Sequence, residues 1–209
     1  MLEHLRPAVA LMIVLSVLTG LAYPLAMTGF AQLVFPRQAN GSLIEKDGAV
    51  VGSALIGQNF RSDRYFHPRP SATTDTDPND PSKTIDAPYN AANSSASNLA
   101  PTSQKLVDRV KAAVEVWRAT AGPEPVPADA VTTSASGLDP DVSPETARAQ
   151  VAQVAKARGL DESKVRELVE ASIERPLLGL IGVPRVNVLR LNLALDQLKS
   201  SEGKRSSSL

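Results

Sequence analysis

The fold follows from one apolar run near the N-terminus, residues 8–35, which reads AVALMIVLSVLTGLAYPLAMTGFAQLVF. The run contains no Asp, Glu, Lys or Arg. As an α-helix it would be roughly 42 Å long at about 1.5 Å per residue, whereas the hydrocarbon core of a bilayer is about 30 Å thick. We therefore expect a transmembrane helix over residues 8–35, preceded by a short leader, residues 1–7.

Small residues and a proline in this helix predict its shape and its packing against other helices. Pro24 has no N–H for the carbonyl of Gly20, so we expect a kink near this point. Ser16 and Gly20 are small and four residues apart, a spacing that lets another membrane helix approach closely. Ser16, Gly20 and Pro24 are therefore the candidates for packing against membrane helices of partner proteins.

The fate and the orientation of the helix leave alternatives open. A cleaved signal peptide has an apolar region of about 7–15 residues that ends at a small-x-small site, and the longer run here favours a retained anchor. Basic residues lie on both sides of it, with Arg6 before and Arg37 and Lys46 after, so charge gives little preference. The short leader favours a cytoplasmic N-terminus and a C-terminal domain outside the cytoplasm.

The remaining residues, 36–198, are expected to form one small polar domain of the α+β class. Asp47-Gly48 separates two strand-like runs and indicates an early β-hairpin. Residues 71–101 are rich in Asp, Asn, Ser, Pro and Ala, which predicts a long loop. Start, stop and periodicity signals predict later helices over about residues 103–120, 144–159, 162–175 and 187–198. The polar tail, residues 199–209, is expected to be flexible.

Composition and missing motifs narrow the function. Lys plus Arg and Asp plus Glu both number 22, which argues against nucleic-acid binding because that function needs a basic face. The chain has no cysteine, which excludes disulfides, thiolate catalysis and Cys-ligated zinc. Neither G-x-x-x-x-G-K-[ST] nor G-x-G-x-x-G occurs, so a backbone cradle for phosphates is not supported. No DKTGT-like phosphorylation sequence is present either, so the chain is not itself a P-type pump.

Two weaker patterns suggest chemistry. His67 and Ser71 together would suit a hydrolase, although a lone histidine among prolines and aromatics is more often packed or hydrogen-bonded. The spacing of an EF-hand calcium loop is matched by Asp75, Asp77, Asn79 and Asp86. Asp80 stands where that loop needs glycine, and the alternative is a solvated acidic loop.

Eight short motifs carry the most specific signal. In chain order they are QANGS (38–42), GSALIGQNF (52–60), YFHPRPSA (65–72), PYN (88–90), SNL (97–99), SASGLD (134–139), VAKAR (154–158) and VNVLRLNLALD (186–196). In this order the chain resembles the C subunit of the bacterial potassium-transporting Kdp ATPase, from residue 5 to residue 198. It departs from many members in having Ser95-Ala96 where they have a glycine, and from some in its longer acidic segment, 73–86.

The resemblance implies an accessory, non-pumping subunit of an ATP-driven potassium uptake complex in the inner (plasma) membrane, needed for assembly and activity. It implies as partners a channel-like potassium-binding subunit, a P-type ATPase subunit, a small membrane peptide and the lipid bilayer. The subunit itself would not be catalytic. The family has also been described as a catalytic chaperone that raises the ATP affinity of the ATPase subunit through a transient complex with ATP. ATP is thus the one cofactor that the resemblance implies, and the sequence has no phosphate-binding motif for it.

An extracytoplasmic domain cannot touch cytoplasmic ATP, so in that orientation we expect the ATP effect to be allosteric. We predict that residues 58–71 and 90–98 contact the channel-like subunit. The contact residues would be Gln58, Phe60, Tyr65, Phe66, His67, Arg69 and Asn98, whose mixed aromatic and polar character suits an interface. For Phe60 and Phe66 the alternative is a place in the core. The alternative functions are a cytoplasmic domain that binds ATP directly, or an anchored extracytoplasmic hydrolase or calcium module.

Overall fold

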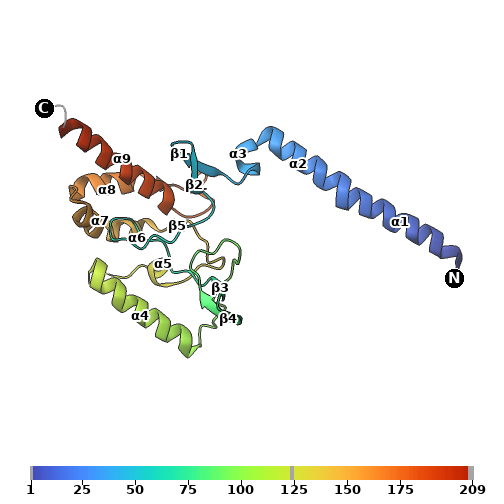
Figure 1. Cartoon of the computed structure of the whole chain (residues 1–209), viewed down its shortest axis with the longest axis horizontal. Helices are drawn as coiled ribbons and strands as arrows, with labels where there is room; N and C mark the ends of the chain where they lie inside the picture. Colours follow the sequence, from blue (N-terminus) through green and yellow to red (C-terminus); the bar gives the residue numbers. More distant parts are fainter. Residues whose placement is uncertain (1, 123–124, 207–209) are drawn as a thin grey trace. The chain divides into compact units, whose positions relative to one another are not determined.

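The computed structural model of the protein describes residues 2–122 and 125–206. The chain divides into two compact units, Met1–Ser53 and Ala54–Leu209. In Figure 1 the first unit is the blue helix together with the hairpin β1–β2, and the second unit holds the other strands and helices. The predicted α+β class, with one N-terminal apolar helix, an early hairpin and later helices, is confirmed.

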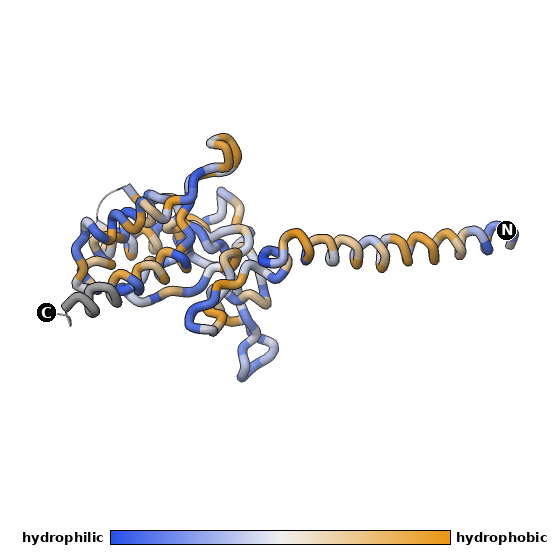
Figure 2. Tube along the Cα trace, turned by 90° about the horizontal axis from the view of Figure 1, so that it is seen from above, coloured by the Kyte–Doolittle hydropathy of each residue, from blue (hydrophilic) through white to orange (hydrophobic). Residues whose placement is uncertain are grey.

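One long helix dominates the first unit. It runs over Leu5–Val34 and is long and apolar enough to cross a membrane, as its orange colour in Figure 2 illustrates. Its parts are α1 (Leu5–Val17), a π-helical turn η2 (Leu18–Ala22) and α2 (Tyr23–Val34). The N–H of Tyr23 donates to the carbonyl of Leu18, five residues back. Because Pro24 cannot donate, the helix widens in the turn before it. The kink expected near Pro24 stays a prediction.

A short helix and the predicted hairpin complete the first unit. After α3 (Pro36–Ala39), β1 (Leu43–Lys46) pairs antiparallel with β2 (Ala49–Ser53). Asp47 and Gly48 have φ values of 53° and 79°, both in the left-handed region that a two-residue hairpin turn requires. The Asp-Gly signal thus predicted the hairpin correctly.

The core of the second unit lies between helices and a small sheet. The helices are α6 (Pro144–Ala149), α7 (Val151–Arg158), α8 (Glu162–Ala171) and α9 (Val188–Ser206). The antiparallel sheet has the order β5 (Asp141–Val142), β7 (Arg185–Asn187), β6 (Ile173–Glu174). Fully buried core residues include Phe66, Val151, Val165, Val169, Val186, Leu191 and Leu195. The sequence did not predict this sheet, because its strands are only two or three residues long.

Local signals set most helix ends in this unit. Ser143 accepts a hydrogen bond from the N–H of Thr146 and starts α6. Asp161 starts α8 by accepting from Ser163, and Gly159 ends α7 with φ of 67°. The predicted helix 144–159 is divided at Gln150 into α6 and α7. The end predicted for α8 at residue 175 is wrong, because the residues after Ala171 pair with β7 instead.

Two further helices lie nearer the surface. The predicted helix 103–120 is α4 (Gln104–Ala121), which ends before Gly122. None of its residues is buried, and its apolar stripe is only half covered. The short helix α5 (Ala128–Val131) was not predicted.

The acidic segment differs from the expected loop. It forms a hairpin of β3 (Thr74–Asp77) and β4 (Asp80–Asp86), in which Thr76 faces Thr84 across the ladder. Asp77 accepts from the N–H of Asn79 at 2.8 Å and so stabilises the turn. The predicted loop is therefore wrong here. Within the described ranges no three His, Asp or Glu side chains are grouped so as to hold a metal ion. Calcium binding by residues 75–86 stays an untested alternative.

Helix α9 extends beyond the predicted end at residue 198. Its backbone is helical through Ser206, inside the segment for which the sequence predicts a flexible tail. Residues 207–209 of that tail lie outside the described residues. The flexibility of the tail stays a prediction.

Candidate functional site

Amide side chains from the helices hold the irregular segment around Phe66. The N–H of Phe66 donates to Oδ1 of Asn192 at 2.8 Å, and Nδ2 of Asn192 donates to the Phe66 carbonyl at 3.0 Å. Gln150 does the same for His67, accepting from its N–H at 2.7 Å and donating to its carbonyl at 3.2 Å. Each amide offers both a donor and an acceptor, so it satisfies the backbone N–H and C=O groups that a neighbouring β-strand would otherwise pair with.

Two hydroxyl groups join the next residues to distant segments. Ser71 Oγ donates to the carbonyl of Gly137 at 2.8 Å and accepts from the N–H of Tyr89 at 3.0 Å. Thr73 Oγ1 donates to the carbonyl of Ala87 at 2.6 Å. Three distant segments therefore meet in one place: residues 65–73, 87–90 and 134–141. We call these segments, together with Gln150 and Asn192, the polar network.

Two glycines allow the backbone segments of the polar network to approach this closely. A Cβ added at Gly57 would lie 2.6 Å from the carbonyl oxygen of Asp139. A Cβ at Gly137 would lie 2.7 Å from the carbonyl oxygen of Ser95, and Gly137 also has φ of 68°. Any side chain at either position would force the backbone apart. The motifs GSALIGQNF and SASGLD thus contribute close packing of the backbone.

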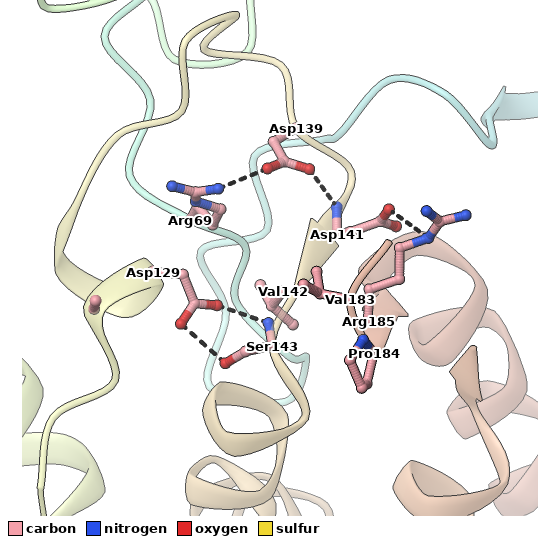
Figure 3. A pocket seen from close by; sticks show the side chains of 10 residues that line it. Arg69, Asp129, Asp139, Asp141, Val142, Ser143, Val183, Pro184 and Arg185 are labelled. Atoms are coloured by element: carbon pink, nitrogen blue, oxygen red, sulfur yellow. Dashed lines mark hydrogen bonds and ion pairs between the residues drawn. The ribbon is translucent and has the colours of Figure 1, made fainter. Parts of the chain in front are cut away.

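A hollow of about 390 Å³ opens beside the polar network (Figure 3). Nη1 of Arg69 donates to Oδ2 of Asp139 at 2.8 Å, and the other oxygen of Asp139 accepts from the N–H of Asp141 at 3.1 Å. Asp129 accepts from both the N–H and the hydroxyl of Ser143, at 2.7 and 2.9 Å. The complete lining is Arg69, Ala128, Asp129, Asp139, Asp141, Val142, Ser143, Val183, Pro184 and Arg185.

Burial changes the electrostatics of this hollow. It raises the pKa of Asp141, although a hydrogen bond from Asn187 and the charge of Arg185, at 3.1 Å, oppose the shift. Burial also raises the pKa of Tyr89, whose hydroxyl donates to the carbonyl of Arg69 at 2.8 Å. The Nε atom of Arg69 is buried and has no hydrogen-bond partner among the described residues. All three carboxylates of the hollow, by contrast, are hydrogen-bonded.

The predicted contact residues divide between core and surface. Phe66 is fully buried in the core, which corrects its assignment as a contact residue and agrees with the alternative for it. Phe60 is half-buried and packs against the core, with its ring centroid 5.6 Å from that of Tyr65. The guanidinium of Arg158 lies 4.6 Å over the Tyr65 ring and forms a 2.9 Å ion pair with Asp196.

The polar members of the predicted set lie further out. Gln58, His67 and Arg69 are half-buried, and Asn98 is exposed with φ of 48°, a conformation that asparagine tolerates. The imidazole Nε2 of His67 is 3.2 Å from the carbonyl of Ser62. Within the described ranges no hydrogen bond joins His67 to Ser71, whose hydroxyl donates to the carbonyl of Gly137 instead.

Sequence reasoning missed the residues that organise the polar network. Asn192, Gln150 and Thr73 are almost completely buried, with exposed fractions of 2%, 3% and 1%. A usable signal existed for Asn192, because it follows Leu191 within an apolar helical pattern where only a buried, bonded polar residue fits. In the first unit, Ser16 and Gly20 are exposed along the helix, and the packing role of Ser16, Gly20 and Pro24 stays a prediction.

A helix long and apolar enough to cross a membrane, followed by one α+β unit, is the arrangement typical of single-span membrane proteins. The chain matches the family described as K+-transporting ATPase, c chain, over residues 5–197, and it belongs to this family. It is an accessory subunit of the Kdp potassium-transporting ATPase complex, and a membrane location is consistent with its helix.

Curated relatives are similar in sequence to this chain over nearly its full length. The potassium-transporting ATPase KdpC subunit of Methylobacterium nodulans is 64% identical over 198 residues, which cover 95% of this chain and 98% of the relative. The subunit of the same name from Bradyrhizobium diazoefficiens is 62% identical over 94% of this chain and 98% of its own. The KdpC subunit of Rhodopseudomonas palustris strain BisB18 is 62% identical over 95% of this chain and 100% of its own.

Proposed function

We propose that the chain is a non-catalytic subunit whose domain lies outside the cytoplasm and contacts the channel-like subunit of the Kdp complex. Its helix would pack among the membrane helices of the partner subunits through Ser16, Gly20 and Pro24. The observation that supports the docking role is the double amide clamp of Asn192 and Gln150 on residues 66 and 67. A surface that is ordered before its partner arrives loses less conformational entropy on binding.

The proposed contact surface is narrower than the set predicted from the sequence. Gln58, Tyr65, His67, Arg69 and Asn98 retain exposed area, while Phe66 and Phe60 support them from the core side. Arg69 is also fixed by its 2.8 Å ion pair with Asp139. The surface therefore combines aromatic, amide and cationic groups on a fixed backbone, a composition that suits a partner contact.

An allosteric effect on ATP affinity fits this arrangement better than direct contact. The hollow beside Arg69 is lined by three carboxylates and two guanidinium groups, and each guanidinium is already paired with a carboxylate, so little positive charge remains to attract a triphosphate. Docking of the domain would instead favour the state of the complex in which the ATPase subunit binds ATP more tightly. The competing function is a cytoplasmic domain that binds ATP itself.

Labelling of single cysteines in intact cells tests the orientation. The chain has no native cysteine, so each variant carries one reactive thiol. Lys83 has a side chain 70% exposed in the second unit, and His4 is exposed at the other end of the apolar helix. With a membrane-impermeant maleimide we expect K83C to react in intact cells and H4C to react only after lysis. The reverse pattern would reject the extracytoplasmic domain and favour direct ATP binding.

A charge introduced at Asn98 tests the contact surface. Asn98→Asp keeps a residue type that tolerates a positive φ, so the backbone should not change. We expect N98D to weaken co-purification with the channel-like subunit and to lower potassium-stimulated ATPase activity. Asn79→Asp makes the same chemical change on the exposed hairpin and serves as the control. Equal behaviour of the two variants would remove Asn98 from the interface.

A further inference from the structure

An apolar turn in the second unit has no role in the polar network. We call residues 176–184, with the sequence PLLGLIGVP, the apolar finger. It contains no charged residue, and in Figure 2 it is an orange loop on a blue neck. Its large side chains are Leu177, Leu178, Leu180, Ile181 and Val183, which are 66%, 84%, 86%, 66% and 72% exposed. Apolar groups concentrated at one exposed tip indicate a contact with an apolar medium or partner.

The finger is an ordered turn that satisfies several of its own backbone groups. The N–H of Leu177 donates to the carbonyl of Ile181 at 3.0 Å, and the N–H of Ile181 donates back at 3.1 Å. The N–H of Gly179 donates to the carbonyl of Pro176 at 3.0 Å. Leu178, Gly179 and Gly182 have positive φ, which tightens the turn and directs side chains outward. Paired backbone groups lower the cost of entering a medium without water.

The neck of the finger carries unbalanced positive charge. Arg185 pairs with Glu174 and Asp141, each at 3.1 Å, and Arg190 also pairs with Glu174. Arg175 is exposed and makes no ion pair in the part of the chain that the structure describes. The carboxylates that share its shallow depression, Glu145 and Glu170, both face Arg148, at 4.0 and 2.6 Å. Arg175 is therefore available to an anionic group beside the apolar tip.

The chain itself points to the occupant. Its first unit carries a helix able to cross a bilayer, and the second unit is joined to it covalently at residues 53 and 54. A bilayer that holds the helix is thus tethered to the second unit, which raises the effective concentration of the lipid surface for the finger. A tip with five exposed apolar side chains, next to Arg175, which has no ion-pair partner among the described residues, matches the layering of acyl chains beneath anionic headgroups.

We propose that the apolar finger inserts into the boundary between headgroups and acyl chains of the membrane that holds the helix. A tip of this size gives only reversible binding by itself, so the contact depends on the covalent connection. The finger then acts as a second membrane contact that limits how the domain can rotate about its anchor. This inference is independent of the docking surface around Asn98 and of the side on which the domain lies.

Fluorescence quenching by lipids tests the proposal on the full chain, reconstituted without other subunits. Leu180→Cys carries an environment-sensitive fluorophore in vesicles of phosphatidylcholine and phosphatidylglycerol with brominated acyl chains. Val116→Cys is the matched control, because Val116 is an apolar residue of α4 that is 67% exposed. Ile181→Cys repeats the measurement at a second finger position. We expect quenching at 180 and 181 to be several times that at 116.

Two further measurements distinguish contact with lipid headgroups from contact with another subunit. Replacing phosphatidylglycerol by phosphatidylcholine, or Arg175 by Gln, should weaken quenching at 180, and indifference to both changes would remove the headgroup from the proposal. Equal quenching at 180 and 116 would overturn the insertion itself. The proposal would also be overturned if the fluorophore at position 180 moved into an apolar environment only after the other Kdp subunits were added. That result would favour an apolar groove on one of those subunits.

Discussion

Asn192 and Phe66 together show how single residues determine this domain. The amide of Asn192 pairs with both backbone groups of Phe66, and the Phe66 side chain is fully buried in the same core cluster as Leu191 and Leu195. The same residue position therefore has its backbone in the polar network and its side chain in the core. A change of either side chain would disturb both.

Truncation of Phe66 separates a core role from a contact role. Phe66→Ala should lower the free energy of unfolding by about 3–5 kcal/mol, because a cavity replaces a fully buried ring. Phe60→Ala should cost less, since Phe60 is only half-buried. Chemical unfolding of the full chain in detergent, monitored by hydrogen exchange of α9, measures the free energy of unfolding of both variants. Unchanged stability of F66A with a loss of partner binding would restore Phe66 to the interface.

The raised pKa of Asp141 predicts a pH dependence of stability. Burial makes Asp141 bind its proton more tightly in the folded state than in the unfolded state, where the pKa is near 3.8. The free energy of unfolding should therefore fall as the pH rises from 3.8 through the raised pKa. Asp141→Asn lacks this contribution, so the difference between the two unfolding curves should grow over that interval. Parallel curves for the wild type and D141N would contradict the assignment.

Local residues were predictable and distant partners were not. Ser143, Asp161, Gly159 and the Asp47-Gly48 turn act within four residues of themselves, so the sequence shows them directly. The partners of Asn192 and Gln150 lie 126 and 83 positions away in the chain. No local pattern identifies such partners, and the candidate site was therefore found only in part.

At the scale of elements, the hairpin β3–β4 explains why the expected loop was wrong. Its strands carry charged and polar residues on both faces and are mostly exposed, so they lack the apolar alternation that identifies a strand. Pro78 and Pro81 also resemble loop residues. Cross-strand threonines and side-chain hydrogen bonds in the turn stabilise the hairpin instead.

The outer part of this hairpin should be dispensable for stability. Thr74 and Asp86 are Cα partners, so residues 75–85 can be replaced by Asn-Gly as a two-residue turn. Thr74 then still accepts from Asn90 and Asn93, at 3.0 and 2.9 Å. We expect the free energy of unfolding to change by no more than about 0.5 kcal/mol. A large loss in chemical unfolding would mean that the hairpin supports the domain.

The apolar helix permits a test of its small residues. Gly20 lies in the π-helical turn with no heavy atom within 4 Å of an added Cβ, and Gly29 in α2 is equally free. Gly20→Leu should leave membrane insertion intact but reduce co-purification of the other Kdp subunits, because a large side chain keeps a neighbouring helix away. Gly29→Leu is the control. Equal yields of complex for both variants would exclude Gly20 from the contact.

At the scale of the whole molecule, the division into two units follows from where the hydrogen bonds lie. The first residues of the second unit are held inside it, since the Ala54 carbonyl accepts from Asn187 at 3.0 Å and the N–H of Gly57 donates to Leu138 at 2.8 Å. The general architecture was predictable from hydropathy and motif order. The two-unit division and the three-stranded sheet were not, because they depend on contacts between distant residues.

A protease site inserted between Ser53 and Ala54 tests this division. After cleavage, the second unit should keep its circular dichroism and its thermal midpoint, because its hydrogen bonds and core are internal. The same insertion without protease serves as the control. A fragment that unfolds on cleavage would show that the first unit supports the core.

The clamp of Asn192 on Phe66 also sets the order of events when the protein is made. Residue 66 leaves the ribosome long before residue 192, so its backbone groups have no partner while most of the domain is being synthesised. The domain can therefore complete its fold only after nearly the whole chain has emerged, since contacts this distant close late. Until the last helix has emerged, the domain lacks the clamp that fixes the backbone of residue 66. The same delay leaves the core residues exposed to aggregation while the chain is being made, whereas the apolar finger stays exposed even in the folded domain.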